Sequence, residues 1–297
     1  MKNQTPILAT LVAWFVTGSI VFFLSKGGAS WNGIPVFVVL ASIAFLMQWL
    51  IFIPSYLYKT EHFFDLTGAV TYLTLLVSVG TFLTPQLDAR SFILLGLVGL
   101  WASRLGLFLF RRVRKANGDS RFTVMKTQFW PFFMTWNLQG LWVFLTAIAA
   151  LAAITSPIKS DLQLTGWIGI AFWLFGFAFE VISDRQKTAF RANPDNKGQF
   201  IQQGLWSISR HPNYFGEIVL WIGIAIIAFP VLEGWTFLAL ISPVFVFFLL
   251  TKVSGIPLLE AQGLERWGDT PAYQHYLKHT PVLIPKVFAR KVEKSVE

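Results

Sequence analysis

Long apolar runs alternate with short polar connections along almost the whole chain. Eight of these runs are long enough to cross a bilayer as helices. They cover residues 7–24, 35–53, 63–83, 92–110, 129–153, 164–179, 214–230 and 235–251. Seven spans would remain if one run lay flat or fused with its neighbour. The pattern therefore predicts an all-α polytopic membrane bundle of seven to eight transmembrane helices.

One polar stretch interrupts this pattern between the sixth and seventh runs. If the sixth helix continues into it, four charged residues spaced by four, three and four positions lie on one face. This first polar stripe consists of Glu180, Asp184, Lys187 and Arg191. The next helix starts with a second stripe of Asn213, Glu217 and Trp221. Two stripes that meet at the membrane edge predict a pocket for a large, charged, planar ligand.

Composition narrows the class of protein. Of the 297 residues, 55% are hydrophobic and only 13% are charged, which excludes a soluble globular chain. There is no Cys, which excludes disulfides, thiolate metal sites and cysteine nucleophiles, and the 4 scattered His predict no metal centre. The formal net charge of +9 suggests nucleic-acid binding, but it lies in loops, where the positive-inside rule explains it better.

The basic residues also predict an orientation in the membrane. Segment 111–126 carries six Lys or Arg against one acid, and the 184–213 loop and the tail after Gly255 are basic too. The alternate connections hold only Lys26, Arg90 and Lys159. Eight spans with both termini cytoplasmic place every basic loop on the inner side. We find no repeat or linker and expect a single integral-membrane domain (1–297), with N-terminal spans in 1–60, a catalytic bundle in 61–256 and a cytoplasmic C-terminal segment in 257–297.

Two charged residues lie inside apolar runs. Asp65 would cost about 2.5–3.5 kcal/mol at a central position and less near a helix end, so it is expected to face a polar cavity, with Tyr72 on the same face. Arg104 is followed on its face by Arg111 and Lys115, and a buried Arg needs an anion or a polar cavity. The alternative for both is a side chain that reaches the cytoplasmic surface.

Two further segments are polar enough to contribute. Asn137 and Gln139 lie in the fifth run, where amides act either as hydrogen bonds between helices or as the lining of a site. The tail from Leu258 predicts a short amphipathic helix followed by a loop along the membrane. Its Glu260 is expected to help close the polar site.

The polar stretch and its neighbours hold the groups that a dinucleotide requires. The cations that suit its phosphates are Arg104, Arg111, Lys115, Lys187, Arg191, Lys197, Arg210 and His211. Groups for riboses or a carboxamide are Asp184, Asn213 and Glu217, and rings for stacking are Trp206, Tyr214 and Trp221. Glu180 and Asn193 are further cofactor-site candidates in the same stretch. No GxGxxG follows a strand, so the site is not a Rossmann fold, and a dinucleotide would lie among the membrane helices. The cytoplasmic loops and tail would then form a cap over it.

The segment GLWSISRHPNYFGEIVLWIG, preceded by SDRQKTAFRANPDNKG, resembles the C-terminal signature of the steroid 5-alpha-reductase-like membrane proteins. It is most similar to their bacterial branch, formerly described only as a domain of unknown function. The wider superfamily includes sterol C14 and C7 reductases and the isoprenylcysteine carboxyl methyltransferases. The resemblance covers about residues 90–290 and implies a protein of the bacterial inner membrane.

The resemblance also implies roles for particular residues. NADPH would lie in the helical bundle with its phosphates toward the cytoplasm, in contact with Arg104, Asp184, Arg191, Asn213, Glu217 and Trp221, with Glu180 just above them. The reductases hold the substrate ketone with a Gln-Glu-Leu-Pro segment, whose Glu corresponds to Asp65 here. They add a Tyr on the next helix, which is Trp101 in this chain, so Tyr72 could take that role. A loop Arg of the reductases corresponds to Gln199.

The implied reaction is hydride transfer from NADPH to the β carbon of an enone in a flat apolar lipid, such as a 3-oxo-Δ4 steroid. Asp65 would stay protonated in an apolar site and donate a hydrogen bond to the carbonyl oxygen, while a proton reaches the α carbon from water. We expect membrane lipids and an apolar substrate as partners, no nucleic acid, and a monomer.

Two other functions compete with this one. A methyltransferase of the isoprenylcysteine type would place S-adenosylmethionine in the same stretch, but that cofactor has no phosphate to explain Arg104, Arg111 and Arg191. A transporter or scaffold would use Asp65 and Arg104 to line a path, but the spans show no paired broken helices in corresponding halves.

Overall fold

The computed structural model describes residues 4–26, 28–83, 86–116 and 118–286; residues 287–297 of the expected C-terminal segment lie outside it. Within these ranges, eight helical segments are long and apolar enough to cross a membrane, which confirms the predicted all-α polytopic bundle. The main helices are α1 (Gln4–Leu24), α2 (Val36–Leu57), α3 (Phe64–Phe82), α4 (Ala89–Ala116), α5 (Phe129–Thr155), α6 (Leu164–Ala192), α7 (Pro212–Ala228), α8 (Ile241–Phe248), α9 (Ile256–Trp267) and α10 (Pro271–His279).

A short β-hairpin joins α1 to α2 and was not predicted. Its strands are β1 (Ser30–Trp31) and β2 (Ile34–Pro35), which pair antiparallel. The two turn residues Asn32 and Gly33 have φ angles of 50° and 80°, the left-handed values that an Asn-Gly hairpin turn requires.

The chain divides into two compact units. The first consists of Met1–Gly169 and Ile224–Pro243, and the second of Ile170–Gly223 and Val244–Glu297. The boundaries fall within α6, α7 and α8.

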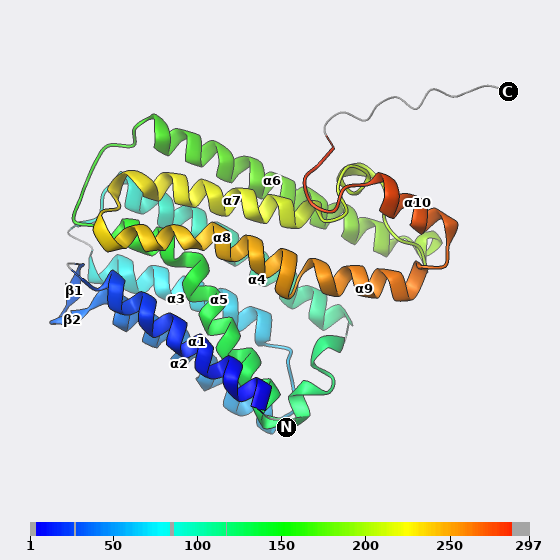
Figure 1. Cartoon of the computed structure of the whole chain (residues 1–297), viewed down its shortest axis with the longest axis horizontal. Coiled ribbons are helices and arrows are strands. Elements are labelled where there is room, and N and C mark those ends of the chain that lie inside the picture. Colours follow the sequence, from blue (N-terminus) through cyan, green and yellow to red (C-terminus); the bar gives the residue numbers. More distant parts are fainter. Residues whose placement is uncertain (1–3, 27, 84–85, 117, 287–297) are drawn as a thin grey trace. The chain divides into compact units, whose positions relative to one another are not determined.

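Helix α5 is the centre of the first unit. Its apolar window is 83% buried, against 28% to 39% for the windows of α1 to α4. It packs against all four of these helices (Figure 1). Its second half is rich in Ala, and such small side chains let neighbouring helices approach closely when lipid provides no hydrophobic driving force between them.

Buried amides hold the first unit together, as one of the two interpretations of Asn137 predicted. The Asn137 Oδ1 accepts hydrogen bonds from the indoles of Trp14 (2.8 Å) and Trp49 (3.0 Å), which joins α5 to α1 and α2. The Gln48 amide donates to Thr71 at 2.9 Å and joins α2 to α3. Asn137 is therefore a structural residue in this unit.

Arg90, which the sequence placed in a connection, is instead 1% exposed at the start of α4. Its guanidinium donates to the Ile227 carbonyl at 2.6 Å, the Asp161 carbonyl at 2.9 Å and the Ser160 hydroxyl at 3.1 Å. It ties α4 to the end of α7 and to the connection before α6.

Replacement of Arg90 by Gln is expected to destabilise the protein by about 3 kcal/mol, because it leaves buried carbonyl groups without their donor. Thermal unfolding of the purified protein in detergent measures this. Arg114→Gln on the same helix is the matched control, since Arg114 is exposed and its guanidinium lies 5.7 Å from the Phe110 ring centroid. Equal midpoints for the two variants would show that the Arg90 bonds do not stabilise the fold.

In the second unit, the sixth helix continues beyond its apolar run to Ala192, as predicted. The eighth apolar run begins in the first unit, ends in the second and is less regular than expected. It consists of a 3₁₀ helix (η7, Gly234–Leu240), then α8, then a π-helical turn (Leu249–Val253), and a bend interrupts the helix before α9. The tail forms two short helices, α9 and α10, where one was predicted.

Candidate functional site

The first candidate group surrounds Asp65 in the first unit. Asp65 lies in the first turn of α3, its side chain is 15% exposed, and its Oδ2 lies 3.9 Å from the Nη2 of Arg112 on α4. Sequence reasoning had selected Arg111 and missed Arg112. A distance of 3.9 Å is at the outer limit of an ion pair, so Arg112 acts on Asp65 mainly by its charge.

Tyr72 and Trp101 lie against each other in the core of the same unit. Tyr72 is 1% and Trp101 0% exposed. Their rings meet edge to face with centroids 5.3 Å apart, and Trp142 of α5 packs edge to face on Tyr72 at 5.4 Å. The two positions considered for the second carbonyl donor thus form one aromatic cluster, to which α5 contributes a ring that the sequence did not single out.

Gln139 and Glu61 fix the start of α3, where Asp65 lies. The Gln139 amide donates to the Phe64 carbonyl at 2.9 Å. Glu61 accepts from the Lys126 ammonium at 2.7 Å and from the Asp119 N–H at 2.9 Å, which pins the α4–α5 connection. Burial favours a higher pKa for the Glu61 carboxyl, but these two hydrogen bonds outweigh it and leave the pKa below its ordinary value.

The cations predicted on α4 differ in exposure. Arg104 is half-buried, with its guanidinium 5.1 Å from the Phe108 ring centroid. Arg111 and Lys115 are exposed further along the helix. Both lie beyond the apolar part of α4.

The second candidate group lies in the second unit and begins with the predicted stripe on α6. Glu180 is 2% and Asp184 7% exposed. One turn further, the Lys187 ammonium lies 4.3 Å from the Trp206 ring centroid, and the Trp206 indole donates to the Ser183 carbonyl at 3.0 Å. Arg191 is exposed at the end of the helix. The stripe therefore runs from two buried acids through the half-buried Lys187 to the exposed Arg191.

Glu260 of α9 contacts both basic residues that precede α7, Arg210 and His211. Its Oε2 lies 2.8 Å from the Nη1 of Arg210, and its Oε1 lies 2.7 Å from the Nε2 of His211. The Tyr214 ring stacks on the His211 ring, at 5.7 Å between centroids and 7° between planes. The expectation that Glu260 joins the polar group is met within this unit.

Burial lowers the pKa of the His211 ring below its ordinary value, and the hydrogen bond to Glu260 offsets only part of this effect. The ring is therefore neutral at neutral pH. A neutral ring beside a carboxylate carries its proton on Nε2, which leaves Nδ1 as an acceptor. This Nδ1 is buried and has no hydrogen-bond partner among the described residues.

Because the pKa of His211 is lower in the folded than in the unfolded state, the unfolded chain binds more protons between these two values. The free energy of unfolding should therefore fall as the pH decreases below about 6.5. Thermal midpoints measured between about pH 5 and pH 7 should show this loss, and His211→Asn should flatten it. His275→Asn is the control, because His275 is exposed. An unchanged pH profile in His211→Asn would contradict the assignment.

The second stripe lies on α7. Glu217 is 9% and Trp221 0% exposed, and the Oδ1 of Asn213 is a buried acceptor without a partner among the described residues. The backbone brings this stripe close to the first one. A Cβ atom on Gly176 would lie 2.5 Å from the Gly216 carbonyl oxygen, and one on Gly216 would lie 2.6 Å from the Glu180 nitrogen. Two glycines thus let α6 and α7 touch through their backbones beside the polar residues.

The predicted site residues in the loop after α6 are exposed. Asn193 is exposed, and its side chain caps a 3₁₀ turn by accepting from the Asp195 N–H at 3.0 Å. Lys197 and Gln199 are exposed. The loop is held by the Trp267 indole, which donates to the Gly198 carbonyl at 2.6 Å.

Two histidines that sequence reasoning treated as scattered lie one turn apart. The rings of His275 and His279 stack on α10 with centroids 3.9 Å apart. Within the described ranges, no group of three or more His, Cys, Asp or Glu side chains could hold a metal ion.

The fold and these polar groups define an integral membrane protein with a bundle of apolar helices that carries buried acids. The chain belongs to the family described as "Protein of unknown function (DUF1295)", whose model matches residues 51–280. This match, together with the relatives below, confirms the family that the sequence motif suggested.

Three curated relatives are similar to part of the chain. "Steroid 5-alpha-reductase DET2" of Arabidopsis thaliana is 26% identical over 45% of this chain and 48% of its own length. "3-oxo-5-alpha-steroid 4-dehydrogenase 1" is 28% identical in Bos taurus, over 39% of this chain and 40% of the relative. The Macaca fascicularis protein of that name is 30% identical over 41% of each chain. The chain thus spans less than half of each of these relatives, and no solved structure matches it.

Proposed function

We propose that this protein is an NADPH-dependent reductase of a lipid-like enone, of the kind that reduces the double bond of a 3-oxo-Δ4 steroid. The similarity to relatives whose names specify a steroid 5-alpha-reductase supports the reaction class. The single observation that carries the proposal is the largely buried acid Asp65 in the first turn of a membrane helix. Inserting a carboxyl group at this position of a membrane helix costs free energy. Such residues therefore usually mark a functional site.

In the proposed reaction, Asp65 donates a hydrogen bond to the carbonyl oxygen of the enone. That oxygen gains negative charge as the β carbon accepts a hydride, and a donor fixed in advance stabilises this charge. Bound NADPH supplies the hydride. The α carbon then takes its proton from water. Tyr72 and Trp101 are buried, so within this aromatic cluster the partly exposed Trp142 ring is the one that would contact a flat apolar substrate.

The second unit contains the types of polar group that would bind a dinucleotide. Two buried acceptors, Nδ1 of His211 and Oδ1 of Asn213, have no partner among the described residues and could accept from ribose hydroxyls or a carboxamide. The buried acids Glu180, Asp184 and Glu217 offer more acceptors. We propose that cations of the second unit hold phosphates: Lys187, Arg191, Lys197 and Arg210. The candidates of the first unit, Arg104, Arg111 and Lys115 on α4, are proposed as phosphate contacts from the sequence alone.

Thermal shift of the purified protein with different cofactors tests the nucleotide. A ligand present at 100 times its dissociation constant adds about 2.7 kcal/mol to the free energy of unfolding. NADPH is expected to raise the midpoint, and S-adenosylmethionine is not. A shift with S-adenosylmethionine alone would favour the methyltransferase function and reject the reductase.

We further propose that the protein resides in the bacterial inner membrane as a monomer, with both termini cytoplasmic. The absence of Cys allows a direct test with single-Cys variants and a membrane-impermeant maleimide. In right-side-out vesicles, Lys159→Cys is expected to react. Lys197→Cys should react only after the vesicles are opened. The reverse pattern would contradict the orientation.

A further inference from the structure

An open groove runs along an exposed, mainly apolar side of α1 in the first unit. It is lined by Phe15, Gly18, Ser19, Phe22 and Phe23. These positions are spaced by three, one, three and one residues, so they form one face of the helix. The groove covers about 12 Å along the helix axis. A Cβ atom added to Gly18 would meet nothing within 4 Å, so the missing side chain leaves open space in the groove.

The ammonium group of Lys26 lies at one end of this groove. Lys26 is the next residue on the same face, and its ammonium lies 4.5 Å from the Phe22 ring centroid, 5.1 Å from that of Phe23 and 5.6 Å from that of Trp235. Within the described residues, Lys26 has no carboxylate within ion-pair distance. Three aromatic rings hold the charge in place without neutralising it.

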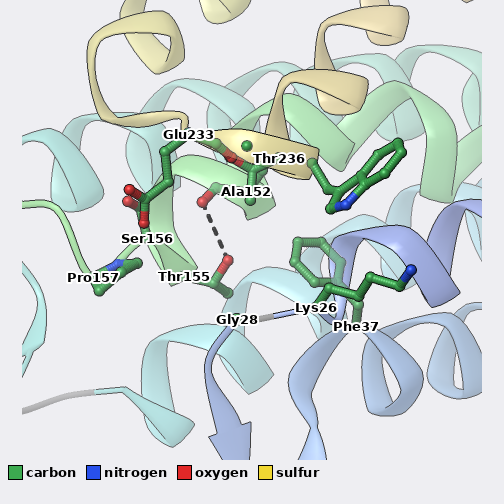
Figure 2. A pocket seen from close by; sticks show the side chains of 11 residues that line it. Lys26, Gly28, Phe37, Ala152, Thr155, Ser156, Pro157, Glu233 and Thr236 are labelled. Carbon is green, nitrogen blue, oxygen red and sulfur yellow. Dashed lines mark hydrogen bonds between the residues drawn. The ribbon is translucent and has the colours of Figure 1, made fainter.

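Lys26 also lines a second hollow, of about 240 Å³, between the C-terminal ends of α1 and α5 and the start of η7. Figure 2 shows Glu233 and Lys26 on opposite sides of this hollow. Glu233 is exposed, and its side chain accepts from the backbone N–H of Thr236, which fixes its position. The hollow is large enough for roughly eight water molecules, which is the size of a lipid headgroup rather than of a whole lipid.

We propose that the groove and the hollow form a binding site for one phospholipid with a phosphoethanolamine headgroup. An acyl chain lies along the α1 groove, because the groove is mainly apolar and extends for about two turns of the helix. The phosphodiester lies at Lys26, where groove and hollow meet. The headgroup ammonium lies at Glu233. One cation and one carboxylate on opposite sides of the hollow complement a zwitterion, whereas an anionic headgroup would meet the uncompensated charge of Glu233.

Native mass spectrometry of the delipidated full chain, titrated with phosphatidylethanolamine or phosphatidylglycerol of identical acyl chains, tests this site. Phosphatidylethanolamine is expected to bind at least about tenfold more tightly than phosphatidylglycerol. Lys26→Gln should weaken its binding about tenfold, and Glu233→Gln should remove the preference between the two lipids. Gly18→Leu should weaken both lipids, because it fills the groove.

The variants are chosen so that folding does not confound the result. The Leu side chain at position 18 enters open space, and a Gln at position 233 can still accept from Thr236. Gly96→Leu on α4 is the matched control, since its Cβ also meets nothing within 4 Å and it lies outside the groove. Equal or tighter binding of phosphatidylglycerol would overturn the headgroup assignment. Unchanged binding in Gly18→Leu and Lys26→Gln would overturn the site.

Discussion

Replacement of Asp65 by Leu is expected to lower the rate of enone reduction by about 10²–10³, because the carbonyl oxygen loses the donor that meets its developing charge. Asp65→Asn should retain more activity, since its amide can still donate a hydrogen bond from the same position. NADPH oxidation in the presence of an enone steroid measures both variants. Full activity in Asp65→Leu would exclude the acid from the reaction.

Two comparisons separate this role from a general effect of removing charge. Asp161→Leu is the acid control, because that side chain is exposed in a connection. Arg112→Gln should change the rate by no more than about fivefold, because a partly exposed pair at 3.9 Å contributes less than about 1 kcal/mol. A loss in Arg112→Gln as large as in Asp65→Leu would indicate that the guanidinium itself meets the carbonyl.

Replacement of Gly176 by Val is expected to destabilise the second unit by about 3 kcal/mol. Its Cβ would lie 2.5 Å from both the Gly216 carbonyl oxygen and the Leu220 nitrogen, so α6 and α7 would have to separate. The separation would also move Glu180 away from α7, and nucleotide affinity should fall with stability. Thermal midpoints and NADPH titrations of the same preparations measure the two effects.

Gly96→Val on α4 is the control for the glycine contact, because a side chain there enters open space. It should leave both the midpoint and the nucleotide affinity unchanged. A Gly176→Val variant as stable as Gly96→Val would show that α6 and α7 do not need a backbone contact.

The features that depend on local periodicity could be predicted from the sequence. The apolar runs gave the eight spans, and the spacing of Glu180, Asp184, Lys187 and Arg191 gave the stripe on α6, because a continuous helix fixes which side chains share a face. The hairpin between α1 and α2 could also have been predicted, because the Asn-Gly pair at residues 32–33 is a strong signal for a two-residue hairpin turn.

Features that depend on packing could not be predicted. Arg111 and Arg112 are adjacent in the sequence, and which of them approaches Asp65 depends on how α4 is turned against α3. A close contact sets that rotation, since a Cβ on Gly106 would lie too near the Cβ of Ala69. Likewise, no local pattern predicts that Arg90 would reach carbonyl groups from two distant segments.

Transfer of a hydride from NADPH to an enone lipid, as proposed for this protein, is tested most directly with isotopically labelled cofactor. The experiment uses NADPH that carries deuterium at the transferable position, the purified protein in lipid nanodiscs and a 3-oxo-Δ4 steroid. Mass spectrometry of the product should show one deuterium, bound to the β carbon, and Asp65→Leu should form this product about 10²–10³ times more slowly. A reduced product without deuterium, or nucleotide binding with no reduction of any enone offered, would contradict the claim.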